Sequence, residues 1–175
     1  AWLARQIEAP ERLAGRMTQL CFLNGGLFPE MHRPRLMQKL LLTPLGPLLT
    51  RVTRAGTFGR SLAAVFGPDT QPTREELADY WTLLSRNQGQ RLLHKHIHYI
   101  RERQTNRARW VGALTQSPVP IALIDGVLDP VSGAHMVAHF RRLLPGLPVV
   151  ELPCGHFPQV EMPREVLPAL ERLWP

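Results

Sequence analysis

The sequence lacks long apolar runs and has only two cysteines. No run approaches the roughly 18 apolar residues of a membrane-spanning helix, so we expect no transmembrane segment. Cys21 and Cys154 are too few for a disulfide framework and have no metal-ligand spacing, which favours a reducing, cytoplasmic location. The chain begins with Ala1 rather than Met, so association with a membrane would depend on an anchor in upstream sequence.

Positive charge is in excess, yet no nucleic-acid-binding motif accompanies it. The formal net charge is +7, and the densest basic stretch is HKHIHYIRERQTNRARW at 94–110. Its arginines alternate with Glu102 and polar residues, which is typical of a solvated helix face, so no nucleic-acid partner is expected. His94 and His98 have the helical spacing of a zinc site, but no third ligand accompanies them. We therefore expect no metal and no cofactor.

The two ends of the chain have an α/β pattern. Residues 1–14 predict the tail of a helix that stops at Gly15, and the apolar stretch 17–24 predicts a buried parallel strand with strand neighbours on both sides. After Pro118, strands and helices alternate, with expected ranges of 119–126, 134–145, 147–153 and 163–174. Pro168 is expected to kink or restart the last helix.

A helical insertion separates these two blocks. Its clearest helix covers 72–87, where Thr73 and Glu76 form a capping box. The apolar face of that helix consists of Leu77, Tyr80, Trp81 and Leu84. Another helix is predicted near 89–104. The chain is therefore divided into core residues 1–26, a helical insertion at 27–114 and core residues 115–175.

Two polar loops follow neighbouring strands of the predicted sheet. They are DGVLDPVS at 125–132 and CGHFPQVE at 154–161, and they bring Asp129 and His156 to one edge. Ligands of open α/β sheets bind at the carboxyl ends of the strands. A carboxylate that accepts the Nδ1 proton of a histidine orients the ring and stabilises the imidazolium. The two residues therefore predict an acid and a base of one catalytic site.

Several segments resemble a known superfamily. GVLDPV (126–131), GHFPQVEMP (155–163) and RWVGAL (109–114) resemble the C-terminal half of an α/β-hydrolase of the epoxide hydrolase and haloalkane dehalogenase group. LNGGLFPEMHRP (23–34) and VFGPDTQPT (65–73) resemble one branch of that superfamily. The resemblance implies the C-terminal part of an α/β-hydrolase fold. It implies strands six, seven and eight of the sheet, with a helical lid inserted after strand six.

The same resemblance implies an acid and a base and leaves two further carboxylates as alternatives. Asp129 matches the acid of the superfamily and His156 matches its base. Asp125 stands where these proteins usually have an uncharged residue, so it is interpreted as a strand-end capping group, with a role as alternative acid left open. Glu30 follows strand six, where some dehalogenases place their acid, and it is a second alternative. Glu161 is expected in the first turn of the last helix, where it would complement the helix dipole.

The lid supplies substrate contacts in this superfamily. Tyr99 resembles the position of the oxygen-polarising tyrosine of epoxide hydrolases. Trp81 and Phe28 are candidates for an apolar pocket wall, with packing inside the lid as the alternative. The expected partner is a small apolar or amphipathic substrate of ester, epoxide or halide type.

No nucleophile elbow occurs in the sequence. Neither Gly-x-Ser-x-Gly nor its Asp variant is present, and the chain contains only the serines Ser61, Ser85, Ser117 and Ser132. Cys154 lies two residues before His156, but it follows a strand without a helix N-terminus that would lower its pKa, so a buried apolar role is favoured. An Asp or Ser nucleophile and the oxyanion donors are expected upstream.

These expectations define two hypotheses. The first is a hydrolase that acts through a covalent intermediate and whose 175-residue chain is inactive alone. The alternative is a non-catalytic hydrolase-like binding or scaffold protein that retains Asp129 and His156.

Overall fold

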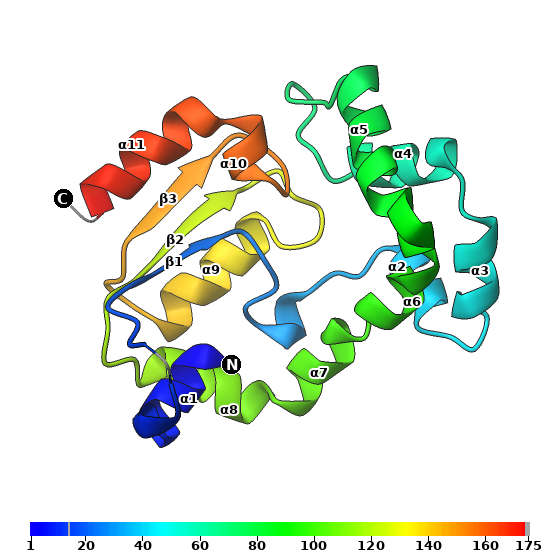
Figure 1. Cartoon of the computed structure of the whole chain (residues 1–175). Helices are drawn as coiled ribbons and strands as arrows, with labels where there is room; N and C mark the ends of the chain where they lie inside the picture. Colours follow the sequence, from blue (N-terminus) through cyan, green and yellow to red (C-terminus); the bar gives the residue numbers. More distant parts are fainter. Residues whose placement is uncertain (14, 174–175) are drawn as a thin grey trace.

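The computed structural model describes residues 1–13 and 15–173, which form a small parallel sheet with helices on both faces and a helical insertion at one side (Figure 1). The strands are β1 Leu20–Leu23, β2 Ile121–Gly126 and β3 Val149–Leu152. The helices packed on the sheet or beneath it are α1 Trp2–Glu8, α8 Arg107–Thr115, α9 Ala134–Leu143, α10 Pro158–Glu161 and α11 Pro163–Leu173. Those of the insertion are α2 Leu36–Leu41, α3 Gly46–Val52, α4 Ala55–Ala63, α5 Arg74–Ser85, α6 Leu93–His96 and α7 Tyr99–Thr105. Single 3-10 segments are η1 Pro10–Arg12, η2 Pro29–Met31 and η3 Arg86–Leu92.

The sheet has the order β1-β2-β3, and both pairs of strands are parallel. Leu20 lies opposite Ile121, and Leu123 lies opposite Val149. The α/β architecture that the alternating pattern predicted is therefore confirmed. In the described part of the chain β1 pairs only with β2, and its side chains are half-buried rather than fully buried.

The two faces of β2 carry two separate cores because successive side chains of a strand point to opposite faces. Ile121 and Leu123 face one way and pack with Met136 and Phe140 of α9. Ile124 faces the other way and packs with α11 through residues such as Val166. All six residues of β2 are buried, which explains the unbroken apolar run of its first four residues.

The helical insertion contains the predicted capping box. Thr73 Oγ1 accepts a hydrogen bond from Glu76 N at 3.1 Å, and Thr73 N donates to Glu76 Oε2 at 2.7 Å. The helix that it opens, α5, packs on α4, where the rings of Trp81 and Phe58 lie 5.9 Å apart.

Three helices differ from expectation. The first helix ends at Glu8 and is followed by η1, because Pro10 cannot continue it. The helix expected near 89–104 is broken into η3, α6 and α7, and left-handed backbone at Asn87 and Gln88 separates it from α5. α11 continues through Pro168. The expected ends at residues 14 and 174 lie outside the described residues, and the three-part division of the chain stays a prediction.

Candidate functional site

The loops after β2 and β3 meet at the carboxyl edge of the sheet. Backbone hydrogen bonds join them, since Val127 N donates to Leu152 O and Leu128 N donates to Cys154 O, both at 3.0 Å. This pairing brings His156 Nδ1 to 2.7 Å from Asp129 Oδ2. The two residues expected to form the acid and base are therefore in hydrogen-bond contact.

The carboxylate of Asp129 is buried and held by several donors. Its Oδ1 accepts from Val131 N at 2.8 Å, and its Oδ2 accepts from Ser132 N at 3.0 Å and Ser132 Oγ at 2.7 Å. Burial by itself raises the pKa of Asp129, but the hydrogen bonds from His156, Ser132 and Val131 outweigh it and hold the pKa below its ordinary value. Asp129 therefore stays ionised and can orient the imidazole ring.

Asn24 connects all three strand ends, a role that the sequence analysis missed. Its side-chain Oδ1 accepts from Gly126 N at 2.6 Å, while Nδ2 contacts Asp129 Oδ2 at 3.3 Å and Gly155 O at 3.4 Å. Its own backbone is left-handed, with φ 54°, which asparagine tolerates better than most residues. The sequence feature that could have indicated this role is the Asn-Gly-Gly turn directly after a predicted strand.

Glu161 binds the loop that carries His156, and its expected place in the last helix is wrong. It ends α10 instead of starting α11. Its Oε2 accepts from Gly155 N at 2.7 Å, and its Oε1 accepts from Phe157 N at 2.9 Å, so both backbone neighbours of His156 donate to it. Oε2 also accepts from Gly67 N at 2.8 Å and Thr70 Oγ1 at 2.5 Å. One carboxylate thus connects the histidine loop to the helical insertion.

The backbones of these two segments touch directly. His156 N donates to Val65 O at 2.8 Å. A side chain at Gly155 would collide with the carbonyl oxygen of Val65, and one at Gly67 would press against the backbone of Cys154. Glycine at both positions permits this close approach.

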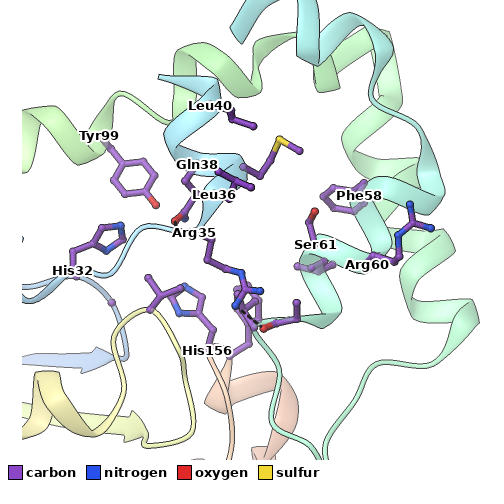
Figure 2. A pocket seen from close by; sticks show the side chains of 18 of the residues that line it. His32, Arg35, Leu36, Gln38, Leu40, Phe58, Arg60, Ser61, Tyr99 and His156 are labelled. Atoms are coloured by element: carbon purple, nitrogen blue, oxygen red, sulfur yellow. Dashed lines mark hydrogen bonds between the residues drawn. The ribbon is translucent and has the colours of Figure 1, made fainter. Parts of the chain in front are cut away.

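His156 lines a cavity of about 760 Å³ between the strand ends and the helical insertion (Figure 2). Its side chain is 30% exposed, whereas that of Asp129 is fully buried. Tyr99 also lines the cavity, and Figure 2 shows its hydroxyl group pointing inward. The ring of His156 is therefore held on its Nδ1 side and open to the cavity on its other side.

The other two proposed wall residues lie elsewhere. Phe28 has no exposed surface, because its ring packs in the core against His139, with ring centroids 4.7 Å apart, and Phe140. Trp81 packs behind Phe58, and only Phe58 is part of the cavity wall. Trp81 therefore packs inside the helical insertion, which had been the alternative, whereas Phe28 packs in the core against α9.

The two alternative acids do not contact His156. Asp125 is fully buried, and neither carboxylate oxygen has a hydrogen-bond partner within the described residues, so it caps no strand. Burial, together with the charges of Asp129 and Glu151, raises the pKa of Asp125 to about 8. Glu30 instead forms a two-pronged ion pair with Arg107, whose Nη2 lies 2.5 Å from Oε1 and whose Nε lies 3.1 Å from Oε2.

Cys154 is an inert thiol in this fold. Its side chain is fully buried, and burial is the main cause that raises its pKa to about 12. A thiol with this pKa is protonated at neutral pH and cannot act as a nucleophile.

The basic stretch is engaged with other parts of the protein. Arg109 forms an ion pair with Glu8 at 2.8 Å, and Arg101 donates to Leu42 O at 2.8 Å. His94 contacts the hydroxyl group of Thr50. Across residues 1–13 and 15–173, no group of three or more His, Cys, Asp or Glu side chains is arranged to hold a metal ion. No helix in the same ranges combines the length and apolar character needed to cross a bilayer.

Two sequence relatives match most of the chain. Over 163 residues it is 41% identical to the mesoderm-specific transcript protein of Mus musculus, covering 89% of this chain and 49% of that protein. It is 36% identical over 163 residues to LipZ of Mycobacterium tuberculosis, which is named as a hydrolase, covering 93% of this chain and 56% of LipZ. The chain therefore spans about half the length of these relatives. No model of a protein family matches it.

The fold also matches solved structures. A haloalkane dehalogenase variant from Bradyrhizobium elkanii aligns with a TM-score of 0.65 and 17% identity, over 98% of this chain and 64% of that one. This confirms the fold that the loop motifs implied. The mesoderm-specific transcript proteins are the branch expected from 23–34 and 65–73. The chain therefore has the C-terminal part of an α/β-hydrolase fold, and its sequence is similar to the mesoderm-specific transcript protein and to LipZ.

Proposed function

We propose that the chain carries the acid and base of a hydrolase that works through a covalent intermediate. The observation that carries the proposal is the 2.7 Å contact between His156 Nδ1 and Asp129 Oδ2 at the wall of a large cavity. Asp129 accepts the Nδ1 proton, which leaves Nε2 as a proton acceptor. A second observation supports it, since Asn24, Ser132 and Glu161 hold this pair in place through hydrogen bonds.

In the proposed reaction His156 activates the water that releases the intermediate. Nε2 takes a proton from the water as its oxygen attacks the covalent intermediate, and the imidazolium that forms is stabilised by the ionised Asp129. The proton then passes to the leaving oxygen. In this scheme the attacking nucleophile is an Asp or Ser outside these 175 residues, and Tyr99, which lines the cavity, polarises a substrate oxygen. Esters, epoxides and alkyl halides fit this scheme.

The first experiment uses the 175-residue chain alone. We expect no hydrolysis of p-nitrophenyl butyrate or styrene oxide above the level of the His156→Ala variant, because the nucleophile and the oxyanion donors are absent. Turnover by the chain that His156→Ala abolishes would overturn the expected inactivity.

The second experiment adds the sequence encoded directly upstream. We expect turnover to appear and to be lost in His156→Gln and strongly reduced in Asp129→Asn, while His96→Gln, on a surface helix, leaves it unchanged. A folded, extended protein that hydrolyses neither substrate would instead support the alternative of a hydrolase-like binding or scaffold protein.

A further inference from the structure

The cavity beside His156 is lined by positive charge without negative charge. Arg35, Arg60 and Arg103 line it together with His32 and His156, and the described wall residues include no Asp or Glu. None of the three arginines forms an ion pair within residues 1–13 and 15–173, although Arg107 and Arg109 in the same helical region do. Three arginine side chains on the wall of one cavity attract an anion.

Arg103 is the most constrained of the three arginines. Its Nη1 donates to Gly26 O at 2.8 Å, and its guanidinium lies over the ring of Tyr99, 4.5 Å from the centroid. It is half-buried, and burial lowers the pKa of its guanidinium. A guanidinium has five N–H donors, and a desolvated charge without a counter-ion is unfavourable. These features point to an anionic group that is held by the remaining donors.

His32 adds an unused polar group at the same place. Both ring nitrogens are shielded from solvent, and neither has a hydrogen-bond partner among the described residues. Burial is the main cause that lowers the pKa of His32 to about 4, with the charge of Arg103 acting in the same direction, so the ring is neutral at pH 7. A neutral imidazole still has one N–H donor. Figure 2 shows His32, Tyr99 and His156 around one hollow.

The wall supplied by the helical insertion is mixed, with apolar side chains beside polar ones such as Gln38, Arg60 and Ser61. The apolar side chains are Leu36, Met37 and Leu40 of α2 together with Phe58 and Leu62 of α4. Leu36 is 73% exposed, which leaves apolar surface uncovered beside the cavity. Phe58 stands across the hollow from His32 in Figure 2. Arg103 and His32 therefore line one part of the cavity, and the apolar side chains of α2 and α4, with Arg60 beside them, line another.

We propose that the cavity binds a medium-chain carboxylate, with the carboxylate group on Arg103 and His32 and the alkyl chain along α2 and α4. Resting on the proposed function, the bound acid is the product of the reaction. Water adds to the acyl group of the covalent intermediate, the bond to the nucleophile breaks, and the acid is released next to His156. The substrate class is then an ester of a medium-chain fatty acid.

Binding to the 175-residue chain is measured by isothermal titration calorimetry with decanoate, decanol and decyltrimethylammonium. We expect decanoate to bind at least about 10-fold more tightly than decanol, because a hydrogen bond to a charged group is stronger than one to a neutral group. Decyltrimethylammonium is expected to bind more weakly than either. Equal affinity for decanoate and decanol would overturn the proposal.

Variants separate the two ends of the site. Arg103→Gln should weaken decanoate binding about 10-fold and leave decanol unchanged, whereas the matched control Arg109→Gln, which breaks a surface ion pair, should change neither. If Arg103→Gln fails to fold, Leu36→Glu provides a second variant because its side chain is exposed. This variant should weaken the binding of decanoate more than the binding of hexanoate. An equal loss of affinity for the two acids, or no loss, would contradict the placement of the alkyl chain.

The outcome is distinguishable from that of the proposed function. If decanoate binds selectively but the extended protein has no hydrolytic activity, the carboxylate site is supported and the proposed reaction is refuted. If the extended protein hydrolyses its substrates but the chain binds decanoate no more tightly than decanol, the reaction is supported and the carboxylate site is refuted.

Discussion

Replacing Asp125 by asparagine removes a buried carboxyl group that has no hydrogen-bond partner in the described part of the chain. The pKa of Asp125 rises from an ordinary 3.8 to about 8, chiefly through burial. Because the folded state holds this proton more tightly than the unfolded state, the contribution of Asp125 to stability falls as the pH rises from 3.8 to about 8 and is constant outside that window. One pKa unit corresponds to about 1.4 kcal/mol, so the penalty at pH 7 is roughly 4 kcal/mol.

The assay is urea unfolding of the chain and of Asp125→Asn at pH 5, 6, 7 and 8. The asparagine side chain has nearly the same shape and does not titrate. The difference in unfolding free energy between variant and parent should therefore grow by about 1.4 kcal/mol per pH unit from pH 5 to pH 7 and by less between pH 7 and pH 8. Asp79→Asn removes an exposed carboxylate on α5 and serves as the control, with a difference that does not grow. A difference for Asp125→Asn that is the same at all four pH values would refute the reasoning.

Two more predictions concern the loop around His156. Glu161→Gln should lower the unfolding free energy by roughly 2–3 kcal/mol, because hydrogen bonds to a charged acceptor are replaced by weaker ones. A double-mutant cycle with Thr70→Val should show coupling between these residues, and independent effects would contradict a shared contact. Cys154 should react with a thiol reagent at pH 8 only after unfolding, and rapid labelling of the folded chain at Cys154 would disprove its burial.

The contact between Asp129 and His156 could be predicted from the sequence because it depends on the topology of the sheet. Parallel strands place their carboxyl ends at one edge, so the loops with Asp129 and His156 had to lie near each other. The capping box of Thr73 and Glu76 was equally accessible, because it is a local pattern that spans four residues.

The contacts that hold the Asp129–His156 pair in place could not be predicted from the sequence because they join distant segments of the chain. Glu161 contacts Gly67, 94 positions away, and Asn24 contacts Asp129, 105 positions away. Phe28 was assigned to a pocket wall because its apolar character suits a wall and a core equally well, and only packing against α9 decides between them. Arg103 resembled Arg107 and Arg109 in the charged stretch until the structure showed ion-pair partners for those two and none for Arg103 among the described residues.

The carboxylate of Glu161 has a consequence for protein engineering. A single oxygen atom receives donors from the histidine loop and from the helical insertion. Exchanging the insertion for that of another protein with an α/β-hydrolase fold would therefore also change the hydrogen bonds that support the loop of His156. A successful chimaera must supply, in place of Gly67 and Thr70, a backbone N–H and a hydroxyl group at the same two points. Substrate range and catalytic competence would otherwise change together.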